Sequence, residues 1–228
     1  MIDACRALCC AGALLLLNAP LGAAEIHFSA DVIGPYKLRM TSLREARHLT
    51  TLQQQYDFSC GSAAVATLLT HHYDHPVNEQ TVFRTMYQHG DQAKIRREGF
   101  SLLDMKRFLA SRGFEADGFV EPLDALVTAK IPAIALINER GYNHFVVIKG
   151  VRDGRVVFGD PAAGTRVMPR EQFEAMWLEG ILFVVRNHQA QARFNRLADW
   201  RVVPRAPIEE VLRAPMDAMR MVRGAGDF

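Results

Sequence analysis

Cys60 is the residue of this chain best suited to covalent chemistry. The alanine-rich stretch after it predicts a helix over 59–72, which puts the thiol at the helix start. Free backbone N–H groups and the helix dipole favour an anion there, so we expect the pKa of the thiol to be lowered. A thiolate is a strong nucleophile, and Gly61 beside it leaves room for a substrate backbone. The alternative is a structural thiol, because free cysteines are usually buried.

A cysteine nucleophile needs a base, and His144 is the best candidate among the eight histidines. It alone opens a buried-looking strand, 144–149, and the next strand returns across a turn near Arg152-Asp153-Gly154. Residues paired across this hairpin should have numbers that sum to about 304, which places Asp160 beside His144. An aspartate there would hold the imidazole in one tautomer and stabilise its protonated form. The spacing predicts a Cys60–His144–Asp160 triad; a packed histidine with a turn aspartate is the alternative.

Three consecutive glutamines, Gln53, Gln54 and Gln55, precede the cysteine. Acyl transfer needs hydrogen-bond donors for the developing oxyanion. Gln54 is six residues before Cys60, and an extended loop of that length can fold the amide back beside the Cys60 N–H. The spacing alone does not choose among the three glutamines.

The elements that must position these residues predict one α+β domain. The chain has 228 residues, 49% of them hydrophobic, a composition that supports a core and excludes disorder and coiled coil. We expect helices at 59–72, after caps at Asn78 and Ser101, and after Pro122. We expect strands at 133–137, 144–149, 155–158, 165–168 and 181–185, with a short helix at 171–177. Helices followed by a compact antiparallel sheet indicate an α+β fold over residues 45–187.

The first 24 residues have the features of a secretory signal peptide. An apolar run from Ala7 to Leu17 is followed by small residues, and we expect cleavage after Ala24; an uncleaved anchor is the alternative. Cleavage removes three of the four cysteines, so the mature chain would keep Cys60 alone and have no internal disulfide.

Two segments flank the expected domain. Residues 25–44 form a polar lead-in with one expected strand over 26–32, ended by Gly34-Pro35. Residues 188–228 form an Arg-rich extension. Its arginines are candidates for docking on a membrane surface or on a partner, but arginine stems also cover apolar surface, and we favour a solvated extension.

We expect neither a metal nor another cofactor. The cluster His71-His72-x-Asp74-His75 has the residue types of a metal site, but it crowds the end of the first helix, where histidines interact well with the helix dipole. The net charge of +2 and the absence of a phosphate-binding loop from the sequence argue against nucleic-acid and nucleotide partners.

Three blocks of the sequence, in order, resemble one family. The block Gln54-Gln55-Tyr56-Asp57-Phe58-Ser59-Cys60-Gly61 resembles the active-site block of cysteine peptidase family 39, papain-like peptidases that cleave leaders after double glycine. Residues 143–147 resemble its histidine block and 159–161 its aspartate block, so the resemblance covers about residues 50–187. It implies a papain-like α+β fold with Cys60 as nucleophile, His144 as base, Asp160 as orienting group and Gln54 as oxyanion donor.

The best-known members are fused to a transporter with a nucleotide-binding domain, and these 228 residues contain neither. With its stretch 99–106, the chain looks most like the free-standing exported members of functional-amyloid secretion systems in Gram-negative bacteria. That likeness implies a periplasmic endopeptidase with a polypeptide substrate from such a system, and peripheral contact with the membrane or an outer-membrane secretion pore. The alternatives are a papain-like acyl transferase or amidase, and a substrate-binding chaperone module without turnover.

Overall fold

The structure is a computed structural model that describes residues 25–30, 33–39 and 42–201. The expected signal segment 1–24 and the chain beyond 201 lie outside the described residues. The chain divides into two compact units, Met1–Ser42 and Leu43–Phe228. In the first unit, β1 (Glu25–Ala30) and β2 (Ile33–Arg39) pair antiparallel. The sequence predicts a strand that ends at Gly34-Pro35, but β2 runs through both residues, because an edge strand tolerates proline.

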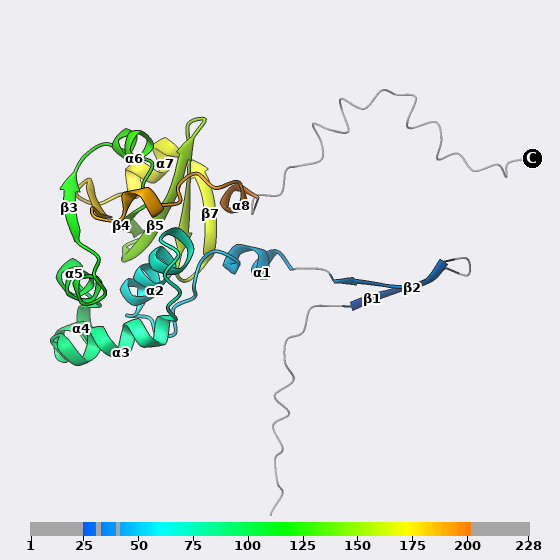
Figure 1. Ribbon diagram of the computed structural model, residues 1–228, viewed down its shortest axis with the longest axis horizontal. Coiled ribbons are helices and arrows are strands. Elements are labelled where there is room, and N and C mark those ends of the chain that lie inside the picture. Colours follow the sequence, from blue (N-terminus) through cyan, green and yellow to red (C-terminus); the bar gives the residue numbers. More distant parts are fainter. Residues whose placement is uncertain (1–24, 31–32, 40–41, 202–228) are drawn as a thin grey trace, which may run out of the picture. The chain divides into compact units, whose positions relative to one another are not determined.

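The second unit carries an antiparallel sheet of six strands among helices (Figure 1). The sheet order is β3-β8-β4-β5-β6-β7. The strands are β3 (Ala116–Val120), β4 (Ala133–Glu139), β5 (Tyr142–Arg152), β6 (Arg155–Asp160), β7 (Gly164–Pro169) and β8 (Ile181–Val185). The α-helices are α1 (Leu43–His48), α2 (Cys60–Thr67), α3 (Glu79–His89), α4 (Gln92–Glu98), α5 (Leu102–Ser111), α6 (Leu123–Ala129), α7 (Arg170–Met176) and α8 (Leu197–Trp200). This arrangement confirms the α+β fold class. Among the described residues, the helices are too short or too polar to span a membrane.

Two apolar layers cover the two faces of the sheet, because side chains alternate along each strand. One layer joins α2, α3 and α5 to residues such as Phe145 and Val147 of β5. The other joins α6 and α7 to Val146 and Ile148 of the same strand. Figure 1 shows α2, α3 and α5 grouped apart from α6 and α7. The sheet is therefore buried on both faces, and the strand ends are left for polar groups.

Local capping explains where several helices begin. The side chain of Asn78 accepts a hydrogen bond from the N–H of Thr81 at the start of α3. Ser101 and Asp104 form a reciprocal capping box at the start of α5, as the spacing predicts. Helix α4, capped by Asp91, and strand β3 are elements that the sequence analysis did not predict.

Helix α2 continues as a π-helical turn, η1 (Leu68–His72). Residues 188–201, the C-terminal segment, cover the end of η1. The N–H of Arg193 donates to the carbonyl of His72 at 2.9 Å, and the N–H of Asn195 donates to that of Lys149 at 2.8 Å. This segment includes a 3₁₀ turn, η2 (Gln189–Gln191), and ends in α8. Residues 188–201 therefore pack on the domain, whereas the sequence analysis assigns them to a solvated extension.

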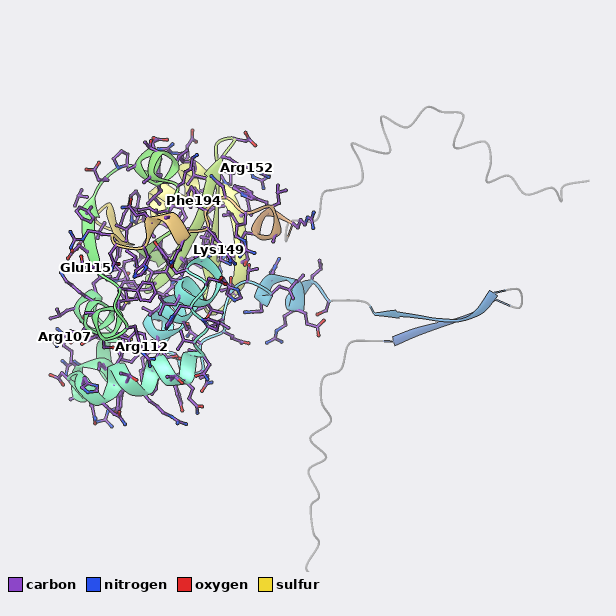
Figure 2. The ribbon with its side chains drawn as sticks, viewed as in Figure 1. Arg107, Arg112, Glu115, Lys149, Arg152 and Phe194 are labelled. Carbon is purple, nitrogen blue, oxygen red and sulfur yellow. The ribbon has the colours of Figure 1, made fainter. Side chains whose placement is uncertain are left out.

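A buried lysine holds the end of this segment. Lys149 and Asp199 are both fully buried, and their Nζ and Oδ1 atoms lie 3.5 Å apart. The ammonium also donates to the carbonyl of Thr50 at 2.6 Å and to the hydroxyls of Thr51 and Thr165 at 2.8 and 3.0 Å. Figure 2 labels Lys149 and Phe194, which belong to the two segments held together here. Lys149 is the bulged residue of β5, and a bulge re-aims a side chain in this way.

Candidate active site

Cys60 is the first residue of α2 and is 6% exposed, so the expected helix-start position is found. Backbone groups of Phe145, Gly61 and Cys60 itself hydrogen-bond the thiol sulfur and favour its anion. Burial outweighs them and raises the pKa of the thiol, opposite to the direction expected from the helix start alone. The resting thiol is therefore protonated at neutral pH and needs a base to release its proton.

Gly61 has a different role from the one the sequence suggests. A Cβ at this position would lie 2.8 Å from the Cε of Met105 and 3.0 Å from the Cβ of Phe100. The glycine thus allows α2 to approach α5 closely, and it is buried rather than open to a substrate backbone.

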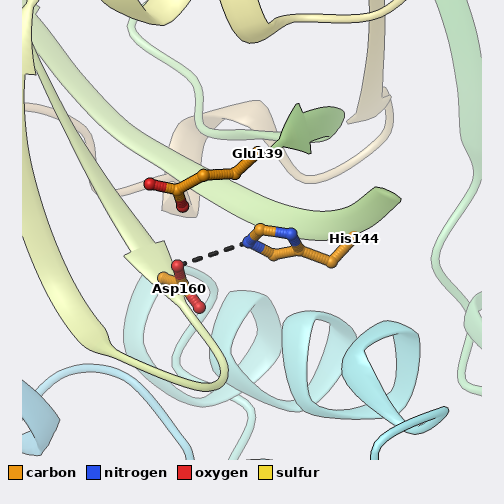
Figure 3. Close-up of side chains that lie close together, drawn as sticks. All are labelled: Glu139, His144 and Asp160. Carbon is orange, nitrogen blue, oxygen red and sulfur yellow. Dashed lines mark hydrogen bonds and ion pairs between the residues drawn. The ribbon is translucent and has the colours of Figure 1, made fainter. Parts of the chain in front are cut away.

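His144 and Asp160 meet at the ends of neighbouring strands. The Nε2 of His144 lies 3.3 Å from the Oδ2 of Asp160, and both side chains are almost fully buried (Figure 3). The paired residues of this hairpin sum to 306 and 307 rather than to 304, as in Val147↔Gly159 and Arg152↔Arg155. The turn is centred between Asp153 and Gly154, both of which have positive φ, and a bulge shifts the register. Asp160 therefore reaches His144 diagonally rather than as a directly paired residue.

The two ring nitrogens of His144 have different surroundings. Nε2 faces the carboxylate, whereas Nδ1 is buried and has no hydrogen-bond partner among the described residues. A buried polar nitrogen without a partner is costly in free energy and is often explained by function. An imidazole held at Nε2 can accept a proton at Nδ1.

Hydrogen bonds keep the carboxyl group of Asp160 ionised. Its Oδ1 accepts hydrogen bonds from the N–H groups of Ala162 and Ala163 at 2.9 and 3.2 Å. Burial alone would raise the pKa of this carboxyl, but the hydrogen bond and charge of His144 and these backbone bonds lower it to about 2. Asp160 therefore carries its charge throughout the neutral range and can stabilise an imidazolium.

Of the three glutamines, Gln54 is the one that contacts the loop of Asp160. Its N–H donates to the carbonyl of Pro161, next to Asp160, at 3.0 Å, whereas Gln53 and Gln55 are exposed. Its side-chain Nε2 donates within the loop, to the carbonyls of Tyr56 at 3.1 Å and Asp57 at 3.4 Å. The described geometry therefore keeps Gln54 beside the aspartate loop, with its amide turned into its own loop.

Tyr142 is a site residue that the sequence analysis missed. Its ring stacks on the imidazole of His144 with centroids 5.6 Å apart, and its hydroxyl donates to the carbonyl of Asp57 at 2.7 Å. Tyr142 thereby links the strand of the histidine to the loop of the glutamines. The two-residue spacing from His144 on one strand puts both on the same face, a signal that the sequence contains.

Arg166 and Glu139 are two more site residues that were not predicted from the sequence. The guanidinium of Arg166 donates to both carboxylate oxygens of Glu139, at 2.7 and 2.9 Å, and to Oδ2 of Asp160 at 3.1 Å. The hydrogen bond from Arg166 holds the pKa of Glu139 below its usual range. Glu139, His144 and Asp160 have ligand atoms within 4.8 Å of one another, the geometry of a metal site. Because Arg166 already donates hydrogen bonds to both carboxylates, we interpret the group as an ion-pair network.

The histidines at the end of the first helix have structural roles. His72 is fully buried, and its Nδ1 lies 2.6 Å from the carbonyl of Arg193. The carbonyl of His71 accepts a hydrogen bond from Arg196 at 2.8 Å. Both contacts fasten the C-terminal segment to the end of η1.

Comparisons with known proteins show the family of this chain. The pattern of the Peptidase C39 family matches residues 48–189. A relative from Pseudomonas fluorescens, named "Probable functional amyloid protease FapD", is 42% identical over 173 residues, which cover 75% of this chain and 76% of that protein. A protein of the same name from Pseudomonas aeruginosa is 39% identical over 93% of this chain and 91% of its own length. The peptidase domain of Streptococcus ComA, a bifunctional ABC transporter, has a similar fold, with a TM-score of 0.50, 20% identity and coverage of 60% of this chain and 98% of that domain.

Proposed function

The chain belongs to the Peptidase C39 family and is a cysteine-type peptidase, and we propose that it is an exported endopeptidase that processes a polypeptide of a functional-amyloid secretion system. The substrate class is supported by two relatives named as functional amyloid proteases, at 39–42% identity. Export to the periplasm is supported by the signal features of residues 1–24.

We propose that Cys60, His144 and Asp160 carry the reaction. The observation behind this is the buried Nδ1 of His144, which has no hydrogen-bond partner among the described residues while Nε2 is held by Asp160. Burial raises the pKa of Cys60, so His144 acts as a general base when substrate binds rather than holding a preformed thiolate.

The proposed steps conserve atoms and charge. The thiol proton passes to Nδ1 of His144 as the sulfur attacks the scissile carbonyl carbon. The carbonyl oxygen becomes an oxyanion that the N–H of Cys60 stabilises, together with the amide of Gln54 once this side chain turns away from the carbonyls of its own loop. The C–N bond then breaks, the leaving amine takes the proton from the imidazolium, and water hydrolyses the thioester with His144 again as base.

Single substitutions test this assignment. Cys60→Ala and His144→Ala should each abolish processing, because nucleophile and base act as a unit. Asp160→Ala should leave residual activity, because the orienting group makes no bond to the substrate. His89→Ala is the matched control, since His89 is an exposed histidine whose Nδ1 contacts only the carbonyl of Thr85 among the described residues. Processing is measured by comparing envelope proteins from cells that carry each variant, and processing that survives Cys60→Ala refutes the proposal.

A separate measurement tests export. N-terminal sequencing of protein from the periplasmic fraction should give Glu25 as the first residue. Soluble cytoplasmic protein that still begins at Met1 would contradict this part of the proposal and leave the peptidase assignment intact.

A further inference from the structure

An arginine and a glutamate form an ion pair next to the aspartate that holds the proposed base. Arg166 of β7 reaches Glu139 of β4 with two parallel hydrogen bonds, at 2.7 and 2.9 Å, across the two strands between them. The same Nη1 atom donates to Oδ2 of Asp160, the oxygen that also faces Nε2 of His144. One carboxylate oxygen is therefore shared between the arginine and the histidine.

The charged groups around the imidazole leave a net charge of one carboxylate. The ionisable groups around it are Asp160 of β6, Glu139 of β4 and Tyr142 of β5, with Arg166 of β7 bonded to both carboxylates. The thiol of Cys60 in α2 interacts with Asp160 and Tyr142. The resting thiol and the phenol are neutral, since burial raises the pKa of both. Arg166 and Glu139 cancel each other, which leaves the single negative charge of Asp160 beside His144.

We propose that Glu139 and Arg166 are a positioning pair that fixes the Asp160 carboxylate and sets the net charge felt by His144. Arg166 donates one hydrogen bond to the Asp160 carboxylate and is itself held by a two-bond contact with Glu139 that lysine cannot reproduce. Glu139 balances the positive charge of the guanidinium, so the negative charge of Asp160 remains available to stabilise the imidazolium. This inference rests on the proposed role of His144 as base and adds two residues that act through Asp160.

The two members of the pair should therefore have opposite electrostatic effects. Glu139→Gln leaves the charge of Arg166 to offset that of Asp160 and should disfavour the imidazolium. Arg166→Gln leaves two carboxylates and should favour it. In buried sites, a charge at such a distance moves the titration midpoint of its neighbour by about one to three pH units. Arg166 and Glu139 are partly exposed, so solvent weakens their effect, and we expect the His144 midpoint to shift by about one pH unit in each direction.

The test measures the imidazole directly, without turnover. In a Cys60→Ala background, histidine-labelled protein is titrated by NMR, and the His144 signal is assigned by its loss in His144→Ala. Relative to the parent, the titration midpoint should fall in Glu139→Gln, rise in Arg166→Gln and return close to the parent in the double variant. Arg170→Gln is the matched control, because Arg170 makes the same two-bond contact with Asp124, at 2.8 and 2.9 Å. It should leave the midpoint unchanged.

Shifts in the same direction, or shifts no larger than that of Arg170→Gln, would overturn the inference. If Arg166→Gln does not fold, Arg166→Lys supplies the test, because the retained charge should keep the midpoint at the parent value while Glu139→Gln still lowers it. In the Cys60 enzyme, the acidic limb of the pH–rate profile should move as the NMR midpoint does, because a general base must be unprotonated to act. Processing that survives His144→Ala would instead refute the proposed function, while the NMR shifts would still report on the pair.

Discussion

Removal of Asp199 should be among the most damaging single changes to the stability of this domain. Its carboxylate is the counter-ion of Lys149, and both side chains are fully buried. Even with this partner, burial lowers the pKa of Lys149 from 10.5 to about 8. A difference of that size corresponds to about 3 kcal/mol of unfavourable free energy for holding the ammonium inside. Asp199→Ala removes the group that offsets this cost.

We expect Asp199→Ala to lower the free energy of unfolding at pH 7 by about 3 kcal/mol, as breaking a buried ion pair does. For a domain of this size, the melting temperature should fall by about 6–12 °C. Lys149→Met together with Asp199→Ala should recover part of the loss, because no buried charge is then left without a partner. Urea unfolding followed by circular dichroism measures the free energy of unfolding, and thermal unfolding followed by the same signal gives the melting temperature.

The matched control is Asp74→Ala. Asp74 pairs with Arg193 of the same C-terminal segment at 3.1 Å, but its side chain is 70% exposed. Exposed pairs contribute little, and alanine adds some strain at the positive φ of Asp74, so this variant should lose no more than about 1–2 kcal/mol. If Asp199→Ala is no more damaging than Asp74→Ala, residues 188–201 are not held to the domain through Lys149, and the argument fails.

Three other predictions concern the active site and the response to pH. Gln54→Ala should lower kcat by about 10²–10³ in a peptide-cleavage assay, as the loss of one oxyanion donor does, whereas Gln53→Ala and Gln55→Ala should do much less; a larger effect at either neighbour would show that the donor is misassigned. Alkylation of Cys60 by iodoacetamide should be slow at pH 6 and accelerate toward alkaline pH, because burial raises the thiol pKa; rapid reaction at pH 6 would show a preformed thiolate instead. His72 is a base whose pKa is lowered from 6.5 to about 3, chiefly by burial, so the unfolded chain binds a proton that the folded one does not. Stability should therefore fall as pH drops below 6.5, by about 1.4 kcal/mol per unit from this residue, and His72→Gln should flatten that slope in urea titrations.

The sheet and the histidine–aspartate pair could be predicted because they depend on local patterns. Four strands of the sheet follow one another as antiparallel neighbours, β4-β5-β6-β7, so hairpin counting brings His144 near Asp160 even with a register error of two or three residues. Long side chains at strand ends tolerate such an error. Capping signals likewise located α3 and α5. These are contacts between residues close in sequence.

The features that the sequence did not reveal depend on distant contacts. Burial of Cys60 reverses the pKa shift that the helix start alone favours, and burial follows from how α2 packs on the sheet. Arg166 and Glu139 are 27 residues apart, and neither belongs to a motif of the sequence. The apolar pattern ends near residue 187, but the next 14 residues dock through backbone hydrogen bonds and one buried ion pair, which leave no periodic signal.

Strand β5 carries the proposed base and also anchors the loop of the proposed oxyanion donor. The start of β5 carries His144, and five residues later its bulge turns Lys149 toward Thr50 and Thr51. These threonines come just before the loop of Gln54, whose backbone is fastened at its other side to Pro161. A Cβ at Gly159 would lie 2.7 Å from the Cε of Lys149, so the neighbouring strand leaves the space that the lysine occupies. The loop of the oxyanion donor is thus anchored to the same strand as the base, and movement of one relative to the other would break a largely buried polar cluster, a cost that holds the backbone of this loop in place.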